Sequence, residues 1–298
     1  MLSATRKKMP EQRAQSTGST GRIAQAFVEA CDAELTACKP GNVHIHADGH
    51  RMSAEDFRKS ARVAAPHLAR EGAGVGARVV GAVGATLEAT GQNTNLGILL
   101  LCAPLAVAAE QIAQPISRPA LRHALMERLD ALTDADARDV FRAIARANPG
   151  GLGERGDHDV RISPAISLRE AMALAADGDR VAAAYINGFE DVFGFGLAVC
   201  DSARQTFEHE PLQVSALYLA FLSSFPDSHI ARKFGPQTAA DVQREARIVA
   251  ADFYSCAPED RLALLMAYDK DLKQRGLNPG TSADFTVATL FADRICAA

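Results

Sequence analysis

Five polar stretches concentrate the side chains that could do chemistry, and they cover residues 39–50, 91–97, 150–161, 227–235 and 278–284. Their cations include Lys39, Arg232 and Lys233. Glycines and helix starts in the same stretches can expose backbone N–H groups. Cations and N–H groups together can hold a polyphosphate. If the stretches converge on one cleft, they predict a site for a phosphorylated ligand. The plainer alternative is that Lys39 offsets a helix dipole and that Arg232 and Lys233 form a surface pair.

Carboxylates in the same stretches supply the complementary chemistry. They include Asp157, Asp159, Asp227 and Asp284, and any of these four could hold Mg²⁺, which usually bridges a few carboxylates and phosphate oxygens. One of these, or Glu34, could act as a general base. Asp284 also has a plainer interpretation as a favourable acid in the first turn of a helix.

The stretch 91–97 reads Gly-Gln-Asn-Thr-Asn-Leu-Gly and runs directly into the most apolar segment of the chain. Asn and Thr side chains can accept hydrogen bonds from helix-start N–H groups, and glycine allows close approach of another group. A helix start of this kind suits an anion or a polar ligand. The alternative is a capped helix start without a ligand.

Three histidines, His44, His46 and His50, raise the possibility of a zinc site. No carboxylate or cysteine stands at a matching spacing. A capping or surface role is the favoured interpretation of these histidines.

Composition and periodicity favour helices. Trp is absent and aromatic residues make up 6% of the 298 residues, whereas strands favour aromatic and β-branched residues. Apolar residues recur at helical spacing, as at Ile23, Phe27 and Ala30, and Ser53 with Asp56 predicts a capping box. We predict an all-α protein with a disordered tail over residues 1–20 and a single domain of roughly ten helices over residues 21–298.

Several classes of protein are disfavoured. A formal net charge of −4 argues against nucleic-acid binding by bulk electrostatics. The longest apolar run, residues 98–109, is too short to span a bilayer, and the first twenty residues lack the apolar core of a secretory signal. Six scattered cysteines without a CxxC pair indicate reduced thiols. We therefore expect a cytoplasmic protein with a small-molecule substrate, and a homodimer on general grounds.

The polar stretches also resemble the triphosphoribosyl-dephospho-CoA synthase family. The resemblance begins with Glu34, Lys39-Pro40-Gly41-Asn42-Val43 and Asn93-Thr94-Asn95-Leu96-Gly97. It continues in order through Gly150-Gly151-Leu152-Gly153 with Asp159-Val160, then Asp227-Ser228-His229-Ile230-Ala231-Arg232-Lys233, and then Asn278-Pro279-Gly280-Thr281-Ser282-Ala283-Asp284. It spans about residues 22–296.

This resemblance implies an all-helical enzyme that joins ATP to 3′-dephospho-CoA, releases adenine, and makes a prosthetic-group precursor for an acyl carrier protein. An acceptor hydroxyl would attack C1′ of the ATP ribose while a carboxylate takes its proton. The implied catalytic residues are Glu34 and Asp159, and the implied Mg²⁺ ligands are Asp227 and Asp284. The implied nucleotide-binding residues are Lys39, Gly41, Asn93, Thr94, Asn95, Gly97, His229, Arg232, Lys233 and Ser282.

Two positions depart from the bacterial synthases. Those enzymes have Asn-Thr-His-Lys-Gly, whereas Asn95 and Leu96 stand here in place of the imidazole and the cation, and His44 replaces a frequent Asp. Three hypotheses result. The chain is a synthase or a close triphosphoribosyl transferase, a related nucleotide-using enzyme in assembly of another cofactor such as a pterin- or furan-type one-carbon carrier, or an inactive nucleotide-binding scaffold. The departures favour the last two, while the retained charged residues speak against a scaffold.

Overall fold

The computed structural model describes residues 12–49, 52–147 and 166–297, and helices dominate these ranges. The first six helices are α1 (Gln12–Thr36), α2 (Ala54–Leu68), α3 (Val75–Thr90), α4 (Leu96–Glu110), α5 (Arg118–Asp130) and α6 (Asp134–Ala147). The next are α7 (Leu168–Ala175), α8 (Arg180–Asn187), the π-helix η2 (Asp191–Gly196), α9 (Leu197–Thr206), α10 (Glu210–Ser224) and α11 (Ser228–Phe234). The last are α12 (Pro236–Ser255), the 3₁₀ turn η3 (Pro258–Asp260), α13 (Arg261–Gln274) and α14 (Gly280–Ala297). Isolated bridges in the loop between α1 and α2 are the only β pairing in the described residues.

The predicted all-α class is confirmed, but the predicted number of roughly ten helices is wrong, because the described ranges contain fourteen α-helices. One difference arises in the segment 180–207, where apolar periodicity predicts a continuous helix. Gly188 and Phe189 there adopt positive φ angles of 65° and 56°, which end α8. A second difference is α11, which forms inside a stretch that its polar residues predict to be a loop. Helix α1 also begins at Gln12, within the range predicted as a tail.

Local capping explains several helix starts. Ser53 and Asp56 form the predicted capping box, in which the Ser53 side chain accepts from the Asp56 N–H and the Asp56 carboxylate accepts from the Ser53 N–H. The Asp179 carboxylate accepts from the N–H groups of Val181 and Ala182 at the start of α8. Polar residues before the helices therefore set where several of them begin.

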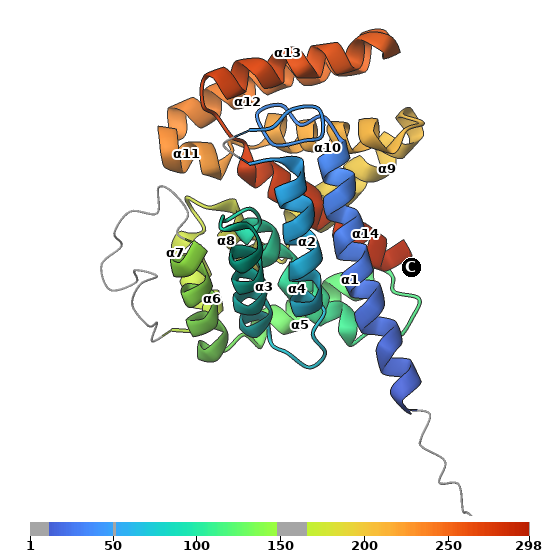
Figure 1. Ribbon diagram of the computed structural model, residues 1–298, viewed down its shortest axis with the longest axis vertical. Helices are drawn as coiled ribbons and strands as arrows, with labels where there is room; N and C mark the ends of the chain where they lie inside the picture. Colours follow the sequence, from blue (N-terminus) through green and yellow to red (C-terminus); the bar gives the residue numbers. More distant parts are fainter. Residues whose placement is uncertain (1–11, 50–51, 148–165, 298) are drawn as a thin grey trace, which may run out of the picture.

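The helices form two groups that meet along α14 (Figure 1). A large apolar core contains buried residues from each of the first six helices and from α8 and α14. Helix α4 lies within this core, and almost every one of its residues is buried. Smaller apolar clusters join α10 to α11, α12 and α13. Helices α11, α12 and α13 lie above the first group in Figure 1, and α14 passes between the two groups. Residues from both groups can therefore face one another where α14 begins.

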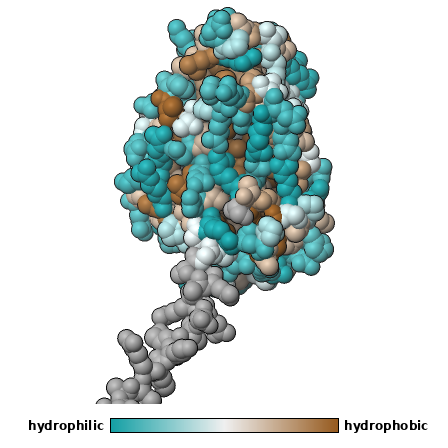
Figure 2. Space-filling model, turned by 90° about the vertical axis from the view of Figure 1, so that its right-hand side faces the viewer, coloured by the Kyte–Doolittle hydropathy of each residue, from teal (hydrophilic) through white to brown (hydrophobic). Residues whose placement is uncertain are grey.

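The surface is mainly polar. On the face shown in Figure 2, hydrophilic residues cover most of the area and apolar residues are scattered among them. No helix in the described part of the chain combines the length and hydropathy needed to cross a bilayer. All six cysteines are free thiols, and four of them are buried, in agreement with the expectation from the sequence.

Candidate active site

Four of the five predicted polar stretches meet at one cavity of about 520 Å³ between the two helix groups. Its lining includes nine of the predicted site residues, namely Glu34, Asn93, Thr94, Asn95, Gly97, His229, Arg232, Lys233 and Asp284. Lys39, Gly41, Asp227 and Ser282 do not line it, and each contacts residues that support the cavity wall. Asp159 and the stretch 150–161 lie outside the described residues. The condition set by the sequence, that the stretches converge on one cleft, is therefore met by the four that the structure describes.

The start of α4 forms one wall of this cavity. Asn93 Oδ1 accepts a hydrogen bond from the Leu96 N–H at 3.2 Å, which caps the helix. Thr94 Oγ1 donates to Ser60 Oγ at 2.6 Å and joins the loop to α2. Asn95 is buried, and its Nδ2 has no hydrogen-bond partner among the described residues. Asn93 and Thr94 thus hold the loop, whereas the Asn95 amide remains unsatisfied.

A buried ion pair supports another part of the cavity wall. Lys39 Nζ donates to Glu34 Oε1 and also to Asn42 Oδ1, the latter at 3.3 Å. Burial raises the pKa of Glu34 and lowers that of Lys39, although each charge acts to stabilise the other. Since Glu34 lines the cavity and Lys39 lies behind it, Lys39 holds the carboxylate in place instead of reaching the ligand itself.

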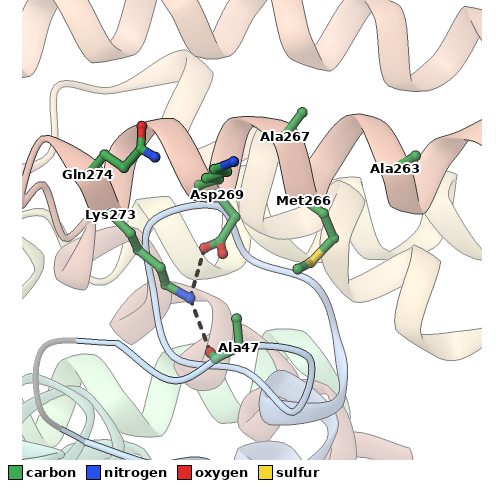
Figure 3. A pocket seen from close by; sticks show the side chains of 8 residues that line it. Ala47, Ala263, Met266, Ala267, Asp269, Lys273 and Gln274 are labelled. Atoms are coloured by element: carbon green, nitrogen blue, oxygen red, sulfur yellow. Dashed lines mark hydrogen bonds and ion pairs between the residues drawn. The ribbon is translucent and has the colours of Figure 1, made fainter.

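The loop after Lys39 is fixed to α13. The Gly41 N–H donates to Asp269 Oδ1 at 2.9 Å, and Gly41 has a φ of +81° with only 2.8 Å between an added Cβ and Pro279 Cδ. Lys273 reaches from α13 to Asp269 Oδ1 at 3.0 Å and to the Ala47 carbonyl at 3.1 Å (Figure 3). Gly41 is therefore structural. The open depression of about 710 Å³ shown in Figure 3 contains none of the predicted site residues.

The histidines of the same loop do not form a zinc centre in the part of the chain that the structure describes. His44 is buried, and its Nε2 lies 3.3 Å from Asp269 Oδ1, whereas His46 is exposed and His50 lies outside the described ranges. Across residues 12–49, 52–147 and 166–297, no three His, Cys, Asp or Glu side chains are placed to hold a metal ion together. His44 anchors the loop.

Asp227 joins α11 to α14. Its Oδ1 accepts from the N–H groups of His229 and Ile230 at 2.9 and 3.2 Å, and its Oδ2 accepts from the Ser282 N–H and Oγ at 2.8 and 2.9 Å. Burial nevertheless raises the pKa of Asp227, against the lowering effect of these hydrogen bonds. Both oxygens are occupied and the residue does not line the cavity, so the structure gives Asp227 and Ser282 a structural role.

Asp284, unlike Asp227, has a side chain that faces the cavity without a hydrogen-bond or ion-pair partner in the described part of the chain. Burial raises its pKa well above the ordinary value, and the nearby carboxylates of Asp227 and Glu34 add to this. Gly97 makes room for it, because a Cβ at Gly97 would lie 2.6 Å from Asp284 Cγ. Asp284 is therefore a carboxyl group that a ligand or a cation can reach.

The cations of the cavity come from α11. Arg232 and Lys233 both line it, and Arg232 Nη1 donates to Asp179 Oδ2 at 3.2 Å. Burial, with a smaller effect of Arg232, lowers the pKa of Lys233. An anionic ligand would offset the repulsion between the two cations. The backbone N–H of His229, which also lines the cavity, donates to Asp227 and Thr281.

Asn42, Asn278 and Asp179 line the cavity but are absent from the predicted set. Asn42 Nδ2 donates to Asn278 Oδ1 at 2.9 Å, and Asp179 binds Arg232. Asn42 and Asn278 lie inside two of the five polar stretches, so their position in the sequence already indicates candidate ligand-binding amides. The sequence signal for Asp179 was its position one residue before a helix, which is typical of an N-cap.

This fold and cavity define an all-α protein with a small-molecule cleft of mixed charge. A family model described as ATP:dephospho-CoA triphosphoribosyl transferase (CitG) matches residues 20–298, and the chain belongs to this family. It is accordingly a transferase of the triphosphoribosyl-dephospho-CoA synthase type.

A solved structure has the same fold. It is the crystal structure of a protein from Archaeoglobus fulgidus that is proposed to be a triphosphoribosyl-dephospho-CoA synthase. The two share 24% sequence identity with a TM-score of 0.61, over 78% of this chain and 95% of the other. A search of curated proteins finds no match.

Proposed function

We propose that the chain transfers the triphosphoribosyl group of ATP to a hydroxyl group of 3′-dephospho-CoA and releases adenine. The observation that carries the proposal is the meeting of Glu34, Asp284 and the α11 cations in one cavity. The family match supports the reaction class. The reaction needs a proton acceptor, a phosphate-binding group and space for two substrates, and the first two are present in the lining.

Glu34 is the proposed general base. In the reaction, the acceptor oxygen forms a bond to C1′ of the ATP ribose as its proton passes to Glu34. The C1′–N bond breaks, and its electron pair leaves with adenine, which takes up a proton. A carboxylate whose pKa is raised by burial is a better proton acceptor near neutral pH than an exposed one.

Arg232 and Lys233 are the proposed triphosphate-binding residues. Their position on one short helix places positive charge at one side of the cavity, and charge-assisted hydrogen bonds to phosphate are strong. Binding the triphosphate there would fix the ribose relative to Glu34 and so orient C1′ for attack.

Mg²⁺ fits the cavity as a companion of ATP, because Asp284 has an unpartnered carboxyl group within the described residues and Mg²⁺ commonly uses one or two carboxylates plus phosphate oxygens. We propose Asp284 as its protein ligand. The occupied oxygens of Asp227 leave no comparable position there, so we do not extend the proposal to Asp227. When bound, Mg²⁺ would neutralise part of the triphosphate charge.

The test of the proposed activity is incubation of the pure protein with MgATP and 3′-dephospho-CoA, with chromatographic detection of adenine. We expect adenine in amounts equal to the coupled product, and a strong loss in Glu34→Gln. Glu29→Gln is the matched control, because the Glu29 side chain is half exposed on the same helix. Absence of adenine despite measured ATP binding would refute this reaction.

The test of the metal proposal is calorimetry with MgATP. We expect Asp284→Ala to weaken binding of MgATP, with the exposed Asp271→Ala as the control. Unchanged binding by Asp284→Ala would refute the metal assignment.

Two alternative functions predicted from the sequence remain distinguishable by the same experiments. A related enzyme acting on a one-carbon carrier would bind ATP but would release no adenine when 3′-dephospho-CoA is the only acceptor supplied. An inactive scaffold subunit would release no adenine with any acceptor, and absence of nucleotide binding would favour it. The Asp284 carboxyl, unpartnered among the described residues, argues against a scaffold. We further propose a cytoplasmic location, where ATP is supplied, and a homodimer, which light scattering would test.

A further inference from the structure

The polar and charged groups of the cavity are unevenly distributed. Among the described lining residues, the only Lys and Arg side chains are Arg232 and Lys233 of α11. The loop 92–98 itself carries no charged side chain. It presents amides and the apolar side chains of Leu96 and Ile98, and the Asp284 carboxyl of α14 lies beside Gly97. A ligand with an anionic end and an uncharged end matches this arrangement when the uncharged end faces the start of α4.

Asn95 is the polar group that distinguishes this uncharged loop. Only 5% of the residue is exposed, it lines the cavity, and Nδ2 is buried with no hydrogen-bond partner among the described residues. Its neighbour Asn93 already accepts the Leu96 N–H, so Asn95 is not needed as the side-chain cap of α4. An unsatisfied buried amide costs free energy, and a ligand that pairs with it recovers that cost.

The chemistry of the amide selects the partner. A primary amide offers an acceptor oxygen beside an N–H donor, and the adenine ring offers an amino donor beside a ring-nitrogen acceptor. Phe57 and Leu96 line the same cavity and supply apolar surface for a flat ring. Phe57 lies one helical turn before Ser60, and Ser60 is hydrogen-bonded to Thr94, so Phe57 belongs to the wall next to the Asn95 loop.

We infer that Asn95 is the specificity-determining residue for the adenine ring of the nucleotide, paired with its 6-amino group and an adjacent ring nitrogen. The triphosphate then extends toward Arg232 and Lys233. This inference rests on the proposed function in one respect, that an adenine nucleotide occupies the cavity. It does not depend on whether the bound nucleotide reacts.

The experiment compares two nucleotides by calorimetry in the presence of Mg²⁺, without an acceptor. One is ATP, and the other is purine riboside triphosphate, which lacks only the 6-amino group. Because the analogue has no 6-amino group to pair with the Asn95 amide oxygen, we expect the wild-type protein to bind it about 5- to 100-fold more weakly than ATP. In Asn95→Ala this ratio should fall to about one, while the melting temperature changes little, since the Asn95 Nδ2 holds no described residue.

Asn93→Ala is the matched control in the same loop. Its amide oxygen is occupied by the Leu96 N–H, so this variant should lose stability and keep the nucleotide ratio. Equal binding of ATP and the analogue by the wild-type protein would overturn the inference, as would an unchanged ratio in Asn95→Ala. If the ratio behaves as expected but no adenine is released with 3′-dephospho-CoA, the proposed reaction fails and the role of Asn95 stands. If neither nucleotide binds, both are refuted.

Discussion

Gly97→Ala tests whether the close contact between the start of α4 and Asp284 matters for function. Ordinary contact begins at 3.4 Å, and the new Cβ would lie 2.6 Å from Asp284 Cγ and nearer still to Oδ2, so the carboxyl group must retreat by more than about 1 Å. The group that must move is the end of a side chain that has no hydrogen bond within the described residues. We therefore expect the free energy of unfolding to change by no more than about 1 kcal/mol.

Activity should respond much more strongly than stability. A displacement of about 1 Å in a positioned group can reduce a rate by about 100-fold, so we expect a loss of that order in kcat/KM for adenine release. Unfolding in urea measures the stability change on the same samples. Gly21→Ala on α1 is the control, because an added Cβ there meets nothing within 4 Å.

The physical cause can be isolated with a double-mutant cycle. If Gly97→Ala acts by moving Asp284, then it should cause no additional loss of MgATP affinity in a protein that already carries Asp284→Asn. Additive losses, or a Gly97→Ala protein with wild-type kcat/KM, would refute the reasoning.

Three further predictions concern the charges around the cavity. Lys39→Met should lower the free energy of unfolding by about 3–5 kcal/mol, because it leaves the buried Glu34 carboxylate unpaired, and adding Glu34→Gln should restore much of it. A wild-type urea midpoint for Lys39→Met would contradict this. Burial and the carboxylates of Asp227, Glu34 and Asp179 disfavour the charged form of Asp284 and so raise its pKa in the folded protein. In EDTA, the contribution of Asp284 to the free energy of unfolding should therefore be complete below its ordinary pKa of 3.8. This contribution should decline as the pH rises through the raised folded-state pKa. Melting temperatures of wild type and Asp284→Asn should accordingly diverge in favour of the variant with increasing pH, and parallel curves would contradict the raised pKa. Lys233→Gln should raise the KM for MgATP by about 10-fold through loss of a charge-assisted hydrogen bond, with a smaller effect on the acceptor KM, and equal effects on both would contradict its assignment to the triphosphate.

The helical class was predictable because it depends on local signals. Apolar spacing identified the buried faces, and Ser53 with Asp56 marked a helix start that the structure contains. Two other local signals explain the differences in helix number. Asn187-Gly188 is a typical helix end and separates α8 from η2, and Asp227 is a typical N-cap before α11. Apolar periodicity runs through the first of these positions, and the polar composition of residues 227–235 masks the second.

The convergence of the polar stretches could be predicted only as a condition, because it depends on tertiary packing. Glu34 and Asp284 are 250 positions apart in the sequence and line the same cavity. The burial of Asp269 is another feature that local sequence signals do not predict. It lies within α13 among polar residues, where periodicity suggests a solvated position, yet it is buried and binds the Gly41 N–H, His44 and Lys273. Contacts between residues far apart in the sequence determine both the composition of the cavity and the burial of Asp269.

The two aspartates predicted as metal ligands from the sequence show why residue type alone does not establish a site. Asp227 is the N-cap of α11, and Asp284 lies near the start of α14. Burial raises the pKa of both carboxyl groups. Asp227 uses its four hydrogen bonds to hold α11 and α14, and its carboxylate is therefore required for the wall itself. Asp284 has no such bonds within the described residues, and Gly97 has no side chain that would displace it from the cavity. Removal of Asp227 should therefore lower the melting temperature, whereas removal of Asp284 should lower MgATP affinity, and measuring both quantities for both alanine variants separates the structural carboxylate from the ligand-binding one.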